Sequence, residues 1–180
     1  MIHDIDRVLV SAEEIAATVQ RLGQEITHDY QGRQPYLVGI LKGAVVFLSD
    51  LARRIQLPVT VDFMAISSYG TSRQSSGIVK ITQDLSQNIQ GKDVIIVEDI
   101  VDTGLTLAYL KDLLQVREPR SLTVCTLLNK PSRRKLEAHL DYVGLDIPNE
   151  FVVGYGLDYG EKYRNLPDIC VLKEQVYANG

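Results

Sequence analysis

Short runs of consecutive apolar residues constrain the fold of this chain more than any other feature of its sequence. Such runs, with few polar residues among them, occupy residues 36–41, 93–98 and 121–128, without a regular alternation of polar and apolar side chains. Continuous runs of this length are typical of strands that are buried on both faces. Segments with helical spacing separate the runs, so the sequence predicts an α/β fold with a mainly parallel, twisted sheet flanked by helices.

The first helix has a clear start in the sequence. Ser11 is followed three residues later by Glu14, which is the pattern of a capping box. The apolar residues that follow recur at helical spacing, namely Ile15, Val19, Leu22 and Ile26. Further helices are expected within residues 41–55 and after residue 104, and the second of these ends before Pro119.

Length and composition indicate a single globular domain that covers residues 1–180. Hydrophobic residues make up 45% of the chain and charged residues 23%, which is typical of a globular protein. The formal net charge of −4 argues against non-specific binding to nucleic acid. No apolar stretch approaches the roughly 20 residues of a membrane-spanning helix, and the first residues lack the apolar core of a signal peptide. We therefore expect neither a nucleic acid nor a membrane as a partner.

The two cysteines, Cys125 and Cys170, both lie inside apolar runs. Free cysteines are among the most frequently buried residues, so packing in the core explains both. Two scattered thiols fit a reducing compartment better than a disulfide framework. The sequence therefore predicts a cytoplasmic protein.

Residues 67–77 interrupt the pattern of strands and helices. The stretch reads SSYGTSRQSSG, is polar and rich in serine and glycine, and shows no periodicity. An eleven-residue connection of this kind between two strands is either a mobile lid over a site or an exposed hairpin tip. The residues alone favour neither alternative.

Two adjacent acids, Glu98 and Asp99, come at the end of the apolar run that begins at residue 93. In an open α/β sheet, ligands bind beyond the carboxyl ends of the strands, so these side chains are expected to face a ligand. Neighbouring carboxylates repel each other unless a cation or a group rich in hydroxyls meets them. The vicinal hydroxyls of a sugar, or a metal ion bound to them, would satisfy both acids.

The residues that follow, DTGLT at 102–106, are expected to open a helix. The amide groups at a helix N-terminus favour an anion, and two threonine hydroxyls add donors there. Gly104 would let the backbone close tightly around the bound group. Acids for a ribose beside donors for a phosphate indicate a ribose 5-phosphate site. The alternative is that Asp102 only caps the helix and that the two acids before it are a solvated strand end.

Two common nucleotide-binding motifs are absent. The stretch at 98–106 has neither the glycine spacing nor the lysine of a P-loop. Residues 154–160, GYGLDYG, do not make a dinucleotide fingerprint, because the glycine spacing differs and no helical pattern follows.

The stretch VIIVEDIVDTGLT at 94–106 resembles the phosphoribosyl pyrophosphate-binding motif of the type I phosphoribosyltransferases. Four further segments resemble the hypoxanthine (hypoxanthine-guanine) phosphoribosyltransferases in the same order, namely LKGAVVF (41–47), SSYG (67–70), LLNKP (127–131) and residues 147–167. The resemblance extends from about Val8 to Lys173. It implies the type I fold with a small hood built from terminal segments, and a homodimer or homotetramer.

The resemblance assigns roles to the acidic stretch. The residues that would bind the ribose and its 5-phosphate are Glu98, Asp99, Asp102, Thr103, Gly104, Leu105 and Thr106. Asp102 would lie beside N7 of the purine and act as the catalytic general acid and base. Many relatives carry Lys or Asn at the position of Leu105, but no side chain is needed there if backbone amides hold the phosphate.

The resemblance also assigns the remaining substrate contacts. Pyrophosphate would be bound by Lys42, Gly43 and Arg164; Mg²⁺ by Glu98, Asp99 and Asp158; and the purine by Lys130, Phe151 and Val152. Lys130 would bond the 6-oxygen of the base, and Phe151 would stack on its ring. Ser68 and Tyr69 would belong to a loop, 67–77, that closes over the site.

These residues together predict a purine-salvage enzyme. It would transfer the phosphoribosyl group of 5-phosphoribosyl 1-pyrophosphate to N9 of hypoxanthine, with guanine as a second base, giving IMP or GMP and pyrophosphate. One alternative is a regulatory protein of the same fold that senses nucleotides, although the acidic chain and the presence of Asp102 argue against it. Another is a phosphoribosyltransferase for xanthine or a different base.

Overall fold

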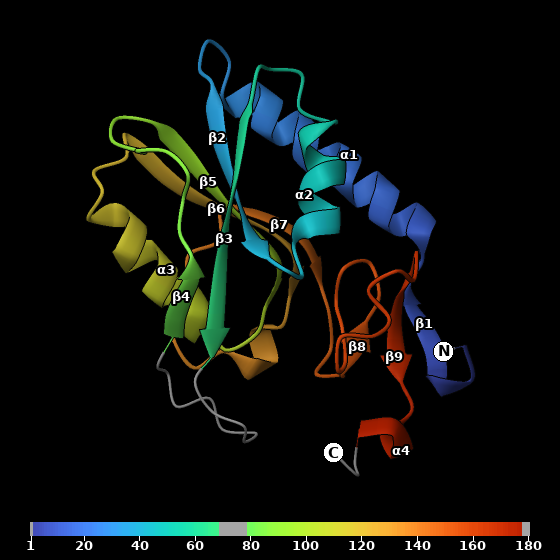
Figure 1. Ribbon diagram of the computed structural model, residues 1–180. Coiled ribbons are helices and arrows are strands. Elements are labelled where there is room, and N and C mark those ends of the chain that lie inside the picture. The colour runs from blue at the N-terminus through green and yellow to red at the C-terminus, as the bar shows by residue number, and fades with distance from the viewer. Residues whose placement is uncertain (1, 69–78, 178–180) are drawn as a thin grey trace.

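A six-stranded sheet forms the centre of the molecule (Figure 1). The computed structural model describes residues 2–68 and 79–177. The strands follow the order β4-β3-β2-β5-β6-β7. Their bounds are β2 Pro35–Leu41, β3 Thr60–Ser68, β4 Val79–Gln83, β5 Asp93–Val101, β6 Ser121–Asn129 and β7 Tyr142–Asp146. Only β4 pairs antiparallel in this sheet, with β3, which confirms the predicted mainly parallel sheet.

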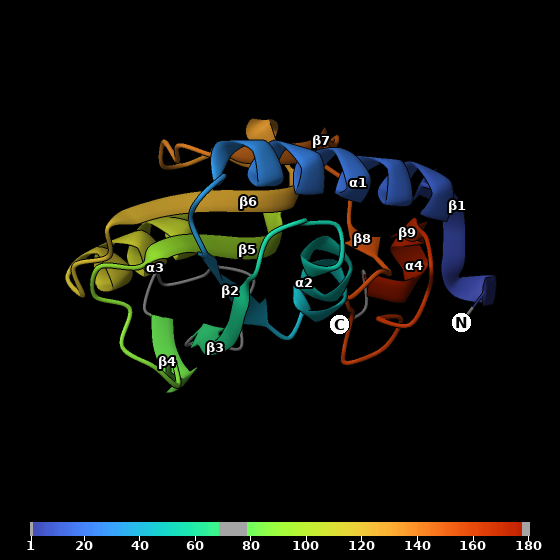
Figure 2. The same ribbon diagram turned by 90° about the horizontal axis from the view of Figure 1, so that it is seen from above.

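Helices cover both faces of this sheet. Helices α1 (Ala12–Asp29) and α2 (Val45–Ala52) pack on one face and α3 (Leu105–Gln115) packs on the other. Figure 2 shows α1 extending from the N-terminal strand across the large sheet. The Ser11 hydroxyl accepts a bond from the Glu14 amide, and the Glu14 carboxylate accepts one from the Ser11 amide, so the predicted capping box is confirmed.

The position of strand β5 between two layers of helices explains why its sequence is continuously apolar. Ile95 and Val97 belong to the core beneath α1 and α2, whereas Val94 and Ile96 belong to the core beneath α3. All four side chains are fully buried. Successive residues of a strand point to opposite faces, so a strand with helices on both faces needs apolar residues at every position.

A second, three-stranded sheet forms a hood beside the carboxyl ends of the large sheet's strands (Figure 1). Its order is β1-β9-β8, so the first and last strands of the described chain pair with each other in it. The remaining elements are η1 Ile2–Asp4, β1 Ile5–Val10, η2 Pro131–Arg133, β8 Val152–Val153, β9 Ile169–Leu172 and α4 Glu174–Tyr177. The hood predicted from terminal segments is therefore confirmed. No helix among the described residues is long and apolar enough to span a membrane.

Two strands extend further than the sequence predicts. β5 continues past Glu98 to Val101, because its pairing with β6 persists to Val101 opposite Asn129. β3 includes Ser68, whose backbone pairs with Val79 of β4. The first two residues of the predicted lid at 67–77 therefore belong to β3, and the rest of that stretch, including Tyr69, lies outside the described residues.

Candidate active site

The paired acids lie where β5 extends beyond its neighbour β2. The β2–β5 pairing ends at Gly39 opposite Val97, so Glu98 and Asp99 follow directly after it. Glu98 is buried and Asp99 is half-buried. Burial, followed by repulsion from Asp99, raises the pKa of Glu98 well above its ordinary value. Burial also raises the pKa of Asp99 to about 6. Neither carboxylate forms an ion pair with a residue that the structure describes, so a cationic ligand would relieve an existing electrostatic cost.

The loop after β2 packs tightly against these acids. A Cβ atom at Gly43 would lie 1.7 Å from Oδ2 of Asp99. On the other side, a Cβ atom at Gly156 would lie 2.2 Å from the carbonyl oxygen of Gly43, and Gly156 has a positive φ of 101°. The Leu41–Lys42 peptide bond in this loop is cis. Gly43 is therefore enclosed by the acidic site and by the turn at Gly156.

The turn after β5 opens α3, as predicted, but Asp102 does not cap the helix. The cap is Gly104, with a φ of 83°, and no side chain bonds to the cap position. The amide of Leu105 makes only a long bond of 3.4 Å to the Thr103 hydroxyl. The alternative reading of Asp102 as a helix cap is therefore wrong. Among the described residues, the amide groups at the start of α3 have no stronger partner than this. They can therefore bind an anion.

A cavity of about 250 Å³ joins the acids, the loop and the turn. Its lining includes Gly43, Glu98, Asp99, Asp102, Thr103, Gly104 and Thr106. Seven residues predicted to act on the ribose, its phosphate or the pyrophosphate thus meet in one place. Leu105 belongs to the same turn but does not line the cavity, which fits a role for its backbone only.

A second cavity of about 430 Å³ adjoins the first and contains the residues predicted to bind the purine. Lys130, Phe151 and Val152 all line it. Lys130 is only 7% exposed, and its Nζ donates a 2.6 Å bond to the carbonyl of Glu150. Burial lowers the pKa of Lys130. Asp102 lines both cavities and so lies between the acids of the first and Lys130 of the second, which is called the base cavity after the predicted role of its residues.

Two arginines that the sequence analysis did not single out belong to this region. Arg133 lines the base cavity and donates a 3.1 Å bond to Asp102 Oδ1. Arg134 lies beside Gly104, and its Nη1 is buried without a hydrogen-bond partner among the described residues. The amides of Lys135 and Leu136 bond the Thr103 carbonyl at 3.0 and 3.2 Å. In the sequence, the basic run after Lys130 was the signal that could have pointed to these arginines. Only the fold shows that this run packs against the turn at 102–106.

The cations expected at the pyrophosphate are held by acids of the hood. Lys42 pairs with Glu161 at 2.9 Å, and Arg164 pairs with Asp158 at 2.9 Å and with Glu161 at 3.2 Å. Arg164 lowers and Asp158 raises the pKa of Asp99, although burial has the larger effect. Asp158 and Arg164 are thus near the acids without lining their cavity. Glu161, which the sequence analysis missed, occupies both cations here.

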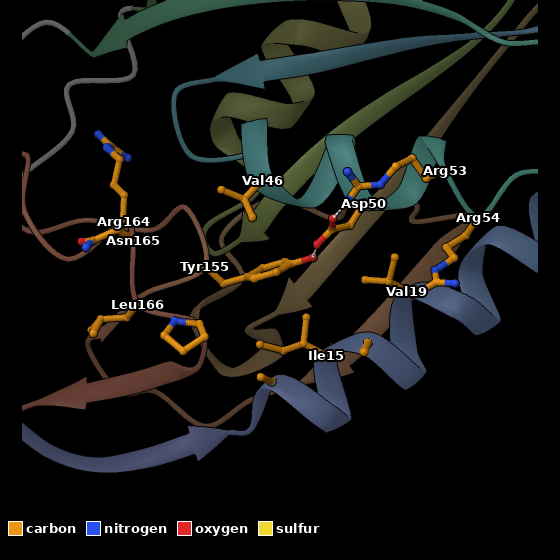
Figure 3. A pocket seen from close by; sticks show the side chains of 13 residues that line it. Ile15, Val19, Val46, Asp50, Arg53, Arg54, Tyr155, Arg164, Asn165 and Leu166 are labelled. Atoms are coloured by element: carbon orange, nitrogen blue, oxygen red, sulfur yellow. Dashed lines mark hydrogen bonds and ion pairs between the residues drawn. The ribbon is translucent and has the colours of Figure 1, made fainter.

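A larger cavity, of about 620 Å³, lies elsewhere. It is bounded by α1, α2 and the hood turn at 164–167, and Figure 3 shows Tyr155 pointing across it toward Asp50. The Tyr155 hydroxyl donates a 2.6 Å bond to Asp50 Oδ2. The acids of β5 do not line this cavity. Cavity size alone therefore does not locate the candidate site, because most of its predicted residues line the two smaller cavities.

Comparison with known proteins identifies the family. Residues 9–160 match the phosphoribosyl transferase domain. The chain belongs to the phosphoribosyl transferase family. The chain is 52% identical over 179 residues to the hypoxanthine-guanine phosphoribosyltransferase of Bacillus subtilis, covering 99% of each chain. It is also 50% identical over 178 residues to the bifunctional protein TilS/HprT of Listeria monocytogenes. That match covers 99% of this chain but 28% of the Listeria protein, so the chain spans little more than a quarter of this relative's length.

Solved structures give the same result. The hypoxanthine phosphoribosyltransferase of Staphylococcus aureus superposes with a TM-score of 0.94 at 50% identity, covering 98% of this chain and 96% of that one. The hypoxanthine phosphoribosyl transferase of Trypanosoma cruzi superposes with a TM-score of 0.92 at 42% identity, covering 97% and 95%. The family resemblance and the fold predicted from the sequence are both confirmed.

The donor set of Glu98 and Asp99 fits a magnesium ion that also binds phosphate groups. Among the described residues, no three His, Cys, Asp or Glu side chains gather into a metal cluster. Magnesium in phosphate-transferring enzymes commonly uses only one or two carboxylates, together with waters and substrate phosphates. Two adjacent carboxylates with raised pKa values and no cationic partner among the described residues supply such a donor set.

Proposed function

We propose that the protein is a purine-salvage enzyme that transfers a phosphoribosyl group from 5-phosphoribosyl 1-pyrophosphate to N9 of hypoxanthine, and also of guanine. The products are IMP or GMP and pyrophosphate. One observation carries the proposal: Asp102 lies between a cavity with acids and a helix N-terminus and a cavity with Lys130 and Phe151. The relatives named for this activity match the chain over nearly its whole length.

In the proposed reaction, the chain binds the sugar and the base in adjoining cavities. Glu98 and Asp99 face the ribose hydroxyls, and the turn at 102–106 binds the 5-phosphate through amides and hydroxyls. Lys42, Gly43 and Arg164 bind the pyrophosphate. Binding of pyrophosphate to Lys42 and Arg164 requires Glu161 to release them, because its carboxylate holds both cations.

In the proposed reaction, Asp102 exchanges a proton with the base. The carboxylate lines the base cavity, where it can exchange a proton with N7 of the purine as N9 attacks the sugar carbon. Arg133 holds Oδ1 of this carboxylate, which leaves the second oxygen for the exchange of the proton. Mg²⁺, held by Glu98 and Asp99 with Asp158 reached through water, would neutralise charge on the departing pyrophosphate.

A panel of free bases tests this proposal directly. With Mg²⁺ and 5-phosphoribosyl 1-pyrophosphate present, we expect pyrophosphate release with hypoxanthine and with guanine. We expect adenine to be rejected by roughly 10⁴-fold in kcat/KM, because its amino group cannot accept a bond from Lys130. If pyrophosphate is released only with xanthine or only with a pyrimidine, the enzyme acts on that base and the proposed substrates are wrong. A protein that binds nucleotides but releases no pyrophosphate with any base would be a sensor instead.

Replacing Lys130 by methionine tests how the base is selected. Lys130→Met keeps the length of the side chain but removes a charged donor, so kcat/KM for hypoxanthine should fall roughly 10- to 100-fold. The relative rate with adenine should rise. Lys111→Met on α3 is the matched control, since that lysine lines neither cavity. Equal losses for hypoxanthine and adenine would contradict the role of Lys130 in selecting the base.

Location and assembly form the last part of the proposal. Both cysteines are free and buried, which supports a reducing compartment such as the cytoplasm. A homodimer or homotetramer is proposed on the family resemblance. The substrates are small molecules, and the net charge of −4 gives no support for nucleic acid as a partner.

A further inference from the structure

The base cavity contains an aromatic ring that comes from the far end of the chain. Phe151, the residue proposed to stack on the purine, packs face to face with Tyr177, with ring centroids 5.2 Å apart and an angle of 23°. Tyr159 meets Phe151 edge to face at 5.5 Å and 87°. Tyr177 belongs to α4 and lines the base cavity together with Phe151, Lys130 and Asp102.

The segment that carries Tyr177 is attached to the hood. The amide of Lys173 donates a 2.9 Å bond to the Asp4 carbonyl, and its Nζ donates a 2.8 Å bond to the His3 carbonyl. Val176 and Tyr177 also pack against a small hydrophobic core that includes Val153 and Leu172 of the hood strands. The Tyr177 ring is therefore held beside Phe151 by the contacts of Lys173, just before α4, and by the packing of Val176 and Tyr177 within it.

The exposed fraction of Phe151 indicates which ring can contact a base and which ring supports it. Phe151 is 40% exposed even though Tyr177 stacks on it. Phe151 also lines the base cavity, so part of its ring stays accessible to a ligand there while Tyr177 is stacked on it. A stacking platform binds a base best when its own orientation is fixed before binding, because less conformational freedom is then lost. The stack with Tyr177 supplies that fixation.

We propose that Tyr177 is a positioning residue for the purine: it stacks on Phe151, fixes the ring that receives the base, and makes α4 part of the base pocket. This inference rests on the proposed function of the site. It concerns affinity for the base only, since Tyr177 lines the base cavity and not the cavity of the acids.

Kinetics of three variants test the inference. For Tyr177→Ala we expect the KM for hypoxanthine to rise about 3- to 10-fold, which corresponds to the loss of one aromatic pair. The KM for 5-phosphoribosyl 1-pyrophosphate and kcat should change less than about twofold, within the range of a neutral substitution. Tyr177→Phe should behave like the wild type, because stacking needs the ring and not the hydroxyl. Gln175→Ala, an exposed position on the same helix, is the control.

Binding measurements separate this inference from the proposed function. By calorimetry, Tyr177→Ala should bind IMP more weakly than the wild type and ribose 5-phosphate equally well. Equal IMP affinity in both proteins would overturn the inference and leave the function standing. Tighter IMP binding would overturn it as well, because Tyr177 would then compete with the base. If the wild type binds ribose 5-phosphate but no 6-oxopurine nucleotide, the proposed function itself fails. Loss of both affinities would make the role of Tyr177 merely structural, which also contradicts the proposal.

Discussion

Asp102→Asn is expected to lower kcat with hypoxanthine by roughly 100-fold or more, the usual contribution of a positioned general acid or base. An asparagine has the same shape and keeps an oxygen that can accept the 3.1 Å bond from Arg133. The site should therefore keep its geometry and lose only the exchange of a proton. Binding of 5-phosphoribosyl 1-pyrophosphate should change much less than kcat, because we propose that the amides and hydroxyls of residues 103–106 bind its 5-phosphate.

Steady-state kinetics and a thermal melt check this expectation together. Asp112→Asn is the matched control, since it makes the same chemical change at an exposed position of α3. A melting temperature close to that of the wild type in both variants would show that the fold is intact. If Asp102→Asn turned over hypoxanthine at nearly the wild-type rate, the acid/base role would have to pass to another group. Arg133 could not take it, because a guanidinium does not release its proton in a protein.

The fold was predictable because its signals are local. The capping box at Ser11 and the apolar run of β5 each depend on a few neighbouring residues, and each is found where the sequence predicts it. Strand ends were less predictable. β5 reaches Val101 because β6 offers it partners as far as Asn129, and that partnership is not encoded within β5 itself.

The residues of the candidate site also fall into those that the sequence predicts and those that it does not. Glu98, Asp99 and the turn at 102–106 form one contiguous stretch, so their chemistry could be inferred from the order of the residues. Glu161 and Tyr177 could not be inferred in this way. The first acts only through its contacts with Lys42 and Arg164, and the second only through a ring 26 residues earlier in the chain, at Phe151. Such residues carry no local pattern, and only the packing of the hood brings them to the site.

Gly43→Ala is expected to reduce kcat/KM for 5-phosphoribosyl 1-pyrophosphate by roughly 100-fold, as a displacement of about 1 Å in a reacting group can do. The new methyl group would lie 1.7 Å from Oδ2 of Asp99, so the carboxylate must rotate away or the loop must withdraw. Either movement separates the loop proposed to bind pyrophosphate from the acid proposed to bind the metal. The assay is the initial rate of pyrophosphate release at varied concentrations of the sugar substrate and of Mg²⁺.

A second glycine shows why this loss would belong to the site and not to the fold. Gly32 lies in the turn before β2, at the opposite end of the sheet, where an added Cβ atom meets nothing within 4 Å but φ is 73°. Gly32→Ala should therefore lower the free energy of unfolding by about 1 kcal/mol through backbone strain, and leave activity unchanged. Gly43 has no such φ, and the atom in its way is the end of a side chain that can move, so its cost should appear mainly as lost activity. If Gly43→Ala instead lost stability and kept its activity, the close packing of Gly43 on Asp99 would serve the fold rather than the binding of pyrophosphate.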